Sequence, residues 1–176
     1  MMQALFTDKD NAILNAVNRT FKSNAYSYEL ITLEEPEFGL KKVLENDVKV
    51  VIAEISLGDF HCKKFFEELK LIKPGIIRIS LTDDQSLMES FNDDGQTHIT
   101  FNKPINTAHF LSWLDKLLIY REQASEELIS HFFENVKLKS YPENILKIVS
   151  MLKDKNFQMA ELAKTINLDT NLKVKL

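Results

Sequence analysis

The chain has 176 residues, of which 44% are hydrophobic and 27% charged, and its net charge is −4. This composition is typical of globular proteins and excludes disordered, collagen-like and low-complexity classes. Its four glycines are too widely spaced for the Gly-rich loops that bind nucleotides, and its single cysteine excludes an internal disulfide framework. The first ten residues show neither the basic nor the apolar segment of a signal peptide, and no apolar run reaches about 18 residues, so we expect neither a signal peptide nor a membrane span. Because its basic residues do not cluster either, we expect a cytoplasmic protein that binds neither membranes nor nucleic acid.

Five short apolar runs within the first 122 residues predict β-strands. They occupy residues 3–7, 26–32, 48–55, 76–81 and 97–101. The third run, VKVVIAEI, is almost continuously apolar and rich in β-branched residues. This pattern is typical of a strand that is covered on both faces of a sheet.

Amphipathic stretches separate these runs and predict helices. Apolar residues recur at helical spacing in residues 11–22, in residues 38–44 after Pro36, in residues 59–72 and 85–91, and from residue 106 onwards. Strand and helix therefore alternate five times, which implies parallel strands joined by right-handed crossovers. The predicted fold class is α/β, a flavodoxin-like (βα)5 doubly wound parallel sheet with strand order 2-1-3-4-5.

In a doubly wound sheet the functional site lies outside the carboxyl ends of the strands. Polar and charged residues occupy these ends here. They are Asp8, Lys9 and Asp10 after the first strand, Glu54 at the end of the third, Thr82 at the end of the fourth, and Lys103 and Pro104 after the fifth.

These strand ends resemble those of response-regulator receiver domains, and the resemblance covers residues 1–122. It implies that acids after the first strand bind Mg²⁺ and that an aspartate ending the third strand accepts a phosphoryl group. Thr82, Lys103 and Pro104 match the family, in which the Lys-Pro peptide bond is commonly cis. The position of the family's aromatic switch residue is occupied by Thr100.

Two departures from the family alter the expected chemistry. Glu54 replaces the phosphoaccepting aspartate, and its longer side chain would reach into the volume of a phosphoryl group, where a small misplacement can cost about 100-fold in rate. Lys9 replaces the second acid and puts a positive charge where Mg²⁺ would need oxygen ligands. We expect Lys9 to act as an internal counter-ion for Asp8 or Glu54, while Asp10 could replace a metal ligand only if the loop shifts register. Glu54 then either mimics a phosphorylated aspartate or is an inert replacement.

The pattern changes after residue 122, where helical spacing continues and no strand is predicted. Residues 123–140 are predicted to form a helical linker, and the helix at 123–138 carries an apolar stripe that includes Phe132 and Phe133. Residues 141–176 resemble the opening of an HDOD output domain, through the helix FQMAELAKTI and the Asp169-Thr170 step. We expect them to be the start of a longer helical domain.

The resemblance implies a signalling function without enzymatic activity. We expect a response regulator with a degenerate, non-phosphorylated receiver, which needs no cofactor and acts through protein–protein contacts. Residues 85–120 and the 123–138 helix are the expected contact surfaces, and a homodimer is one possible complex. Two alternatives stay open. One is a phosphorylatable receiver that uses Mg²⁺, with a nearby acid such as Asp59 as acceptor, and the other is a flavodoxin-like module that binds a small ligand.

Overall fold

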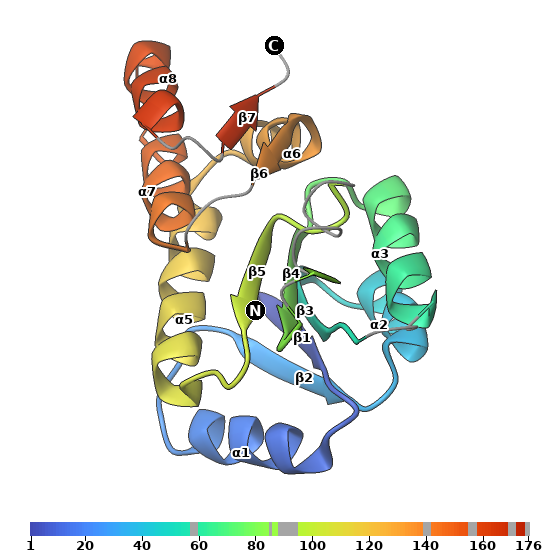
Figure 1. Cartoon of the computed structure of the whole chain (residues 1–176). Coiled ribbons are helices and arrows are strands. Elements are labelled where there is room, and N and C mark those ends of the chain that lie inside the picture. The colour runs from blue at the N-terminus through green and yellow to red at the C-terminus, as the bar shows by residue number, and fades with distance from the viewer. Residues whose placement is uncertain are drawn as a thin grey trace.

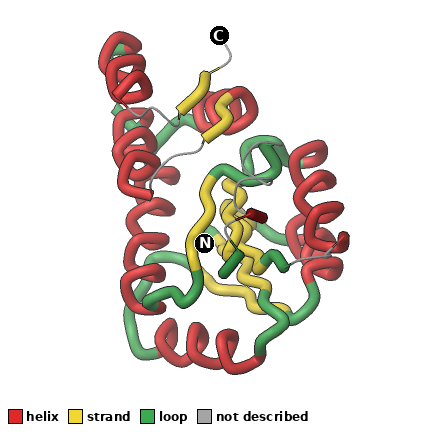
Figure 2. Tube along the Cα trace, viewed as in Figure 1, coloured by secondary structure: helices red, strands yellow, loops and turns green. Residues whose placement is uncertain are grey.

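The computed structural model of the chain describes residues 1–56, 60–84, 86–87, 95–138, 142–154, 158–168 and 172–174. Its centre is a five-stranded parallel sheet in the order β2-β1-β3-β4-β5, with helices on both faces (Figures 1 and 2). The flavodoxin-like strand order predicted from the sequence is therefore confirmed.

The five strands lie where the apolar runs predict them, with ends displaced by a few residues. They are β1 (Gln3–Thr7), β2 (Glu29–Leu33), β3 (Val48–Glu54), β4 (Ile77–Thr82) and β5 (Ile99–Asn102). β4 is buried along its whole length, although it carries an arginine, a serine and a threonine. A strand covered on both faces has no solvent side for polar residues, so these three side chains need partners inside the protein.

The helices of the (βα)5 unit also follow the prediction. They are α1 (Asn11–Lys22), a 3-10 turn η1 (Pro36–Phe38) that leads into α2 (Gly39–Glu45), α3 (Phe60–Ile72) and α5 (Thr107–Gln123). The helix predicted at 85–91 lies mostly outside the described residues, where only Ser86 and Leu87 are seen to be helical. Capping defines the starts of two helices, because the side chains of Asp10 and Asn106 accept hydrogen bonds from first-turn amides of α1 and α5.

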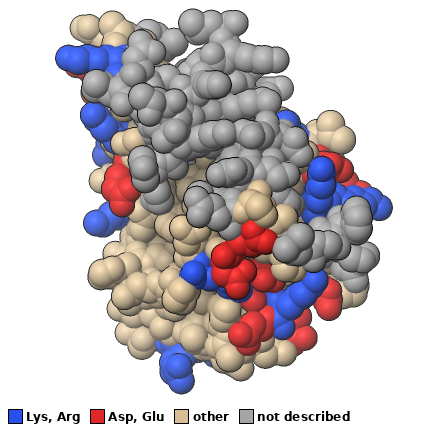
Figure 3. Space-filling view, in the orientation of Figure 1, with Lys and Arg blue, Asp and Glu red and all other residues tan. Residues whose placement is uncertain are grey.

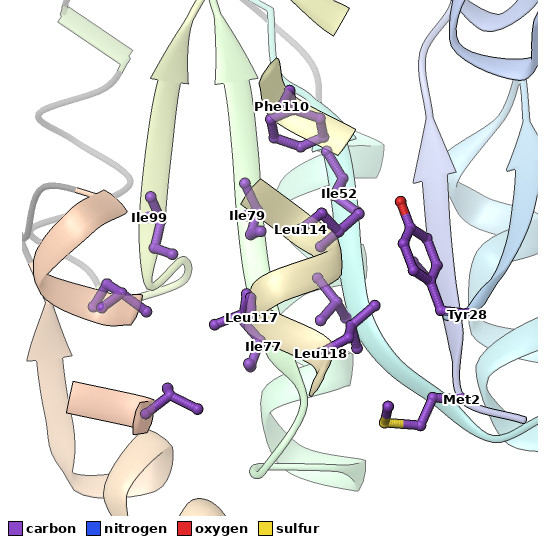
Figure 4. Packing of buried hydrophobic residues seen from close by; sticks show 14 of the residues in the cluster. Met2, Tyr28, Ile52, Ile77, Ile79, Ile99, Phe110, Leu114, Leu117 and Leu118 are labelled. Carbon is purple, nitrogen blue, oxygen red and sulfur yellow. The ribbon is translucent and has the colours of Figure 1, made fainter. Parts of the chain in front are cut away.

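Two apolar clusters hold the helices against the sheet. The cluster beneath α1 and α5 includes Phe110, Leu114, Leu117 and Leu118, which pack against β4 and its neighbours (Figure 4). The second cluster lies on the other face, beneath α2 and α3, and includes Phe66. Each fully buried side chain of this kind stabilises the fold by about 1.5–3 kcal/mol relative to an exposed one. The two clusters therefore stabilise the packing of the helices on the sheet that carries the strand ends.

The C-terminal segment is largely helical, with α6 (Glu126–Asn135), α7 (Pro142–Leu152) and α8 (Met159–Leu168). The prediction of no strand after residue 122 was wrong, because β6 (Val136–Leu138) and β7 (Leu172–Val174) form a two-stranded antiparallel sheet. Strands of three residues are too short for an alternating pattern to identify. Their pairing also joins segments that are distant in sequence, which local periodicity does not report.

The C-terminal helices pack on the receiver-like unit and continue its apolar cluster. In α6, Ile129, Phe132 and Phe133 are buried, whereas Leu128 is 40% exposed. The apolar stripe of the 123–138 helix is therefore covered by the chain itself at three positions, and the contact surface expected on this helix stays a prediction. The limits 1–122, 123–140 and 141–176 stay predictions.

The helices that the structure describes include none that combines the length and the apolar character of a membrane span.

Candidate functional site

Three charged side chains from three strand ends meet at the carboxyl edge of the sheet. Asp8 follows β1, Glu54 ends β3 and Lys103 follows β5. The Lys103 Nζ atom lies 2.8 Å from Asp8 Oδ2 and 3.7 Å from Glu54 Oε1, and the side chains of Asp8, Lys103 and Glu54 are 1%, 15% and 17% exposed. We call this group the strand-end pocket. Figure 3 shows acidic and basic side chains gathered over this region.

Backbone contacts place Lys103 at the pocket. Its amide N–H donates to the carbonyl of Thr82 at 2.8 Å, which holds the residue after β5 against the end of β4. The Lys103–Pro104 peptide bond is cis, as the resemblance to receiver domains implies.

The loop after β1 positions Asp8 differently from its two neighbours. Asp8 Oδ1 accepts a hydrogen bond from the amide of Asp10 at 2.9 Å, and its Oδ2 faces Lys103. The carboxylate of Asp10 accepts from the amide of Ala12 at 2.8 Å and caps α1. Lys9 is exposed. Lys103 thus supplies a cation to Asp8 from the opposite side of the pocket, and the counter-ion role expected of Lys9 stays a prediction.

A receiver fold implies a Mg²⁺ site at these strand ends, but the donor set does not fit one. Mg²⁺ requires near-octahedral oxygen ligands at 2.0–2.1 Å. Here Lys9 follows Asp8 where the family has a second acid, and the carboxylate of Asp10 caps α1. Within the described part of the chain, no three Asp, Glu, His or Cys side chains are grouped so that they could hold a metal ion.

Thr82 and Thr100, at the predicted switch positions, make hydrogen bonds along β4 and β5. Thr82 Oγ1 accepts from the amide of Asp84 at 3.0 Å, and the hydroxyls of Thr100 and Ser80 are 2.7 Å apart. Hydrogen bonds from the hydroxyl and amide of Ser86 lower the pKa of Asp84. Both threonines thus satisfy polar groups between or after the strands, a role that the sequence leaves open.

A cleft of about 540 Å³ lies beside the pocket, between α1 and the loop after β5. Its walls combine apolar side chains with three charged residues. They are Asp10, Ala12, Ile13, Ala16, Asp83, Lys103, Pro104, Ile105 and Thr107. Lys103 lines both the cleft and the strand-end pocket, so a molecule in the cleft would contact the pocket's cation.

Sequence reasoning missed two buried charged or titratable residues, Arg78 and His98. They lie near the starts of β4 and β5, at the opposite end of these strands from Lys103. The signal was present in the run IIRISL, where an arginine interrupts a strand that has both faces covered.

No protein-family model matches the chain. It is 28% identical over 170 residues to human inositol polyphosphate 4-phosphatase type II and to the type II inositol 3,4-bisphosphate 4-phosphatase of Pongo abelii. Each match covers 81% of this chain but only 17% of the relative's length. The similarity therefore concerns a small part of those proteins.

Solved structures of receiver domains share the fold. A CheY-like receiver domain from Methanospirillum hungatei has a TM-score of 0.59 and 23% identity, and covers 70% of this chain and 98% of its own. The receiver of an HD-domain protein from Pseudomonas fluorescens has a TM-score of 0.55 and 20% identity, covering 64% and 82%. The Thermotoga maritima regulator TrrA, solved with Mg²⁺ and BeF, has a TM-score of 0.55 and 21% identity, covering 66% and 98%. The chain has the receiver fold. At these identities the likeness extends to the fold alone.

Proposed function

We propose that this chain is a response-regulator-like signalling module whose strand-end pocket is closed by an internal ion pair. In this proposal it acts through protein–protein contacts and not through a phosphorylation cycle. The observation that carries the proposal is the pair of residues that depart from the receiver pattern, Glu54 at the end of β3 and the exposed Lys9 directly after Asp8.

The charge of residue 9 and the side-chain length of residue 54 both support a pocket that does not undergo phosphoryl transfer. Lys9 puts a positive charge at a position where Mg²⁺ would need an oxygen ligand. Glu54 places its carboxyl one methylene further from the backbone than an aspartate would. Phosphoryl transfer depends on in-line positioning, and this displacement moves the acceptor oxygen out of line.

Magnesium binding tests the proposal with a rescue variant. We expect the amide NMR spectrum of the wild type to show no saturable shifts at millimolar Mg²⁺. Lys9→Asp combined with Glu54→Asp restores two oxygen ligands of the usual length, and we expect saturable shifts at the strand ends in this variant. The matched control is Lys41→Asp with Glu45→Asp, which makes the same changes at an exposed pair on α2. Saturable shifts in the wild type would overturn the proposal.

Glu54 can still be a phosphorylation mimic or an inert replacement, and one substitution separates these hypotheses. Glu54→Gln removes the charge and keeps the size. If Glu54 acts as a mimic, its loss shifts the amides of β4 and β5 beyond the pocket, including those near Thr100. An inert Glu54 predicts shifts only for amides beside residue 54.

We propose that the partner surface lies on α5 and its surroundings within residues 85–120. His109, Ser112 and Lys116 are exposed on α5, whereas its apolar residues face the sheet. A homodimer through this face predicts a concentration-dependent mass in analytical ultracentrifugation, which Lys116→Glu would lower. An HDOD-type identity for residues 141–176 is part of the same proposal and rests on the sequence resemblance.

The two alternatives remain hypotheses with their own tests. A phosphorylatable receiver that uses Asp59 involves a residue outside the described part of the chain. A small-ligand module would use the cleft between α1 and the loop after β5, and it predicts that bound molecules shift the amides of Ile13 and Ile105.

A further inference from the structure

Two buried ionisable side chains lie near the N-terminal ends of β4 and β5, where the strand-end pocket does not use them. Arg78 is 2% exposed and His98 is 1% exposed. They lie next to α6, the first helix of the C-terminal segment (Figure 1). Buried charged groups are costly unless they are paired, so their partners indicate what they do.

Arg78 is held by backbone carbonyls. Its Nε–H donates to the carbonyl of Gln96 at 2.8 Å, and its NH1 group donates to the carbonyls of Pro74 and Ile76 at 3.3 Å each. Burial lowers the pKa of Arg78 to about 10, so the guanidinium stays charged at neutral pH. These contacts fix a positive charge at the edge of the sheet that faces α6.

The hydrogen bonds of His98 define its tautomer. Its Nδ1 accepts from the backbone N–H of Arg78 at 3.0 Å, and its own backbone N–H donates to the carbonyl of Arg78 at 2.8 Å. Because Nδ1 is an acceptor, the ring hydrogen of the neutral imidazole is on Nε2. That Nε2–H donates to the carbonyl of Phe133 at 3.0 Å. Arg78 NH2 lies 2.9 Å from the same nitrogen, and in this tautomer both groups are donors, so Arg78 contributes its positive charge there and not a hydrogen bond to the ring.

The carbonyl of Phe133 belongs to the last turn of α6, which ends at Asn135. The final four carbonyls of a helix lack partners within the helix, and the helix end carries a partial negative charge. Here that end meets a donor from His98 and the positive charge of Arg78. The rings of His98 and Phe133 are also in contact, with centroids 4.7 Å apart.

We propose that Arg78 and His98 form a latch that seats the C-terminal end of α6 on the sheet and thereby holds α6 and α7 on the receiver-like unit. Apolar burial is non-directional, so Ile129 and Phe132 favour contact without fixing the helix position. The hydrogen bond from His98 is directional. Opening the latch would expose Ile129, Phe132 and Phe133. The latch does not depend on the chemistry of the strand-end pocket.

Amide hydrogen exchange on the whole chain tests the latch. His98→Asn keeps a polar group near Nδ1 but removes the donor to Phe133, and we expect exchange in residues 126–135 and 142–152 to rise about tenfold. Residues 77–82 should still exchange more slowly than α6 and α7, because β4 exchanges when the whole fold opens. His98→Gln places an amide near the position of Nε2, and we expect exchange close to the wild type. His109→Asn, at an exposed position on α5, is the control. No rise in α6 and α7 of His98→Asn, or an equal rise in His98→Gln, would overturn the proposal.

If His98→Asn does not fold, the wild type provides the same test. The charged groups that act on His98 are Arg78 and Lys70, both cations. Protonation of the imidazole would therefore add a second positive charge beside Arg78 and remove the acceptor at Nδ1. We expect exchange at pH 5.5, corrected for the intrinsic rate, to rise in α6 and α7 of the wild type and not in His98→Gln. No rise in the wild type, or the same rise in His98→Gln, would overturn the proposal.

Discussion

The two ends of the β4–β5 strand pair each hold a cation, but the cations have different partners. At the carboxyl end, Lys103 lies beside the carboxylates of Asp8 and Glu54. At the amino end, Arg78 donates to backbone carbonyls and stands beside His98 and the end of α6. The first arrangement neutralises charges that could otherwise bind a metal. The second satisfies backbone groups and joins two parts of the chain.

This difference indicates how the fold divides its roles. A lysine between two acids can be removed together with its partners, because the charges cancel as a set. An arginine bonded to carbonyls cannot be removed in this way, since the buried carbonyl of Ile76 and the partly buried carbonyls of Pro74 and Gln96 then lose a donor. We therefore expect the strand-end pocket to tolerate paired substitutions, and the opposite end to tolerate very few.

The largest expected effect is at Arg78. Arg78→Leu leaves the carbonyls of Gln96, Pro74 and Ile76 without their donor, and we expect a loss of about 3 kcal/mol in the free energy of unfolding. Urea denaturation followed by circular dichroism measures it. Arg19→Leu, on the outer part of α1, is the control. A loss below 1 kcal/mol would show that the carbonyls find other partners and that the two ends are alike.

Lys103→Met is expected to cost about 2 kcal/mol, because it leaves the carboxylate of Asp8 buried without its cation. Lys103 is partly exposed, which reduces the effect below that of a fully buried pair. The sharper test is the double variant with Asp8→Asn, in which much of the lost stability should return. If the double variant is less stable than Lys103→Met, the ion pair is not the reason for the loss.

The pH dependence of stability separates the two ends further. Burial, and then the charge of Arg78, hold the pKa of His98 well below 6.5 in the folded protein. The unfolded chain therefore binds the proton more readily, and the stability from neutral His98 is present above pH 6.5 and lost as the pH falls below it. We expect a loss of about 1 kcal/mol between pH 7 and pH 5.5. His98→Gln should remove this loss, and an unchanged slope would contradict the assignment.

The smallest expected effect is at the start of α6. Arg121 is buried and bonds Glu126 through two contacts of 3.0 and 3.1 Å, but the Glu126 side chain is 63% exposed. Solvent screens such a pair, so Glu126→Gln should cost only about 0.5 kcal/mol. Thermal unfolding at low and high salt measures it, and the difference should shrink at high salt. A loss of unfolding free energy as large as that of Arg78→Leu would show that Arg121, and not His98, makes the main contact that holds α6.

The order of strands and the location of the strand-end pocket were predictable from the sequence. Hydrophobic periodicity reports burial along each element, and parallel strands bring their carboxyl ends to one edge. Thus Asp8, Glu54 and Lys103 could be assigned to one site before the structure. The direction of each side chain was not predictable from the sequence. Lys9 is exposed although it directly follows Asp8, whereas Lys103, which precedes a cis peptide bond after β5, lies in the pocket.

The opposite end of the sheet was harder to predict. Arg78 and His98 are separated by 20 residues, and Phe133 follows 35 residues later. Their contact depends on how α6 returns to the sheet after α5, which local patterns do not determine. The pair β6 and β7 was missed for the same reason, since each strand has only three residues and its partner is distant.

Beryllofluoride binding tests the central claim most directly. In the presence of Mg²⁺, ¹⁹F NMR of the wild-type protein detects a bound beryllofluoride as a signal distinct from the free species. A pocket with Glu54 at the acceptor position and Lys9 at the second acidic position predicts only the free signals at every Mg²⁺ concentration. A saturable, Mg²⁺-dependent bound signal that Glu54→Gln abolishes would contradict the account and show that the pocket supports phosphoryl chemistry.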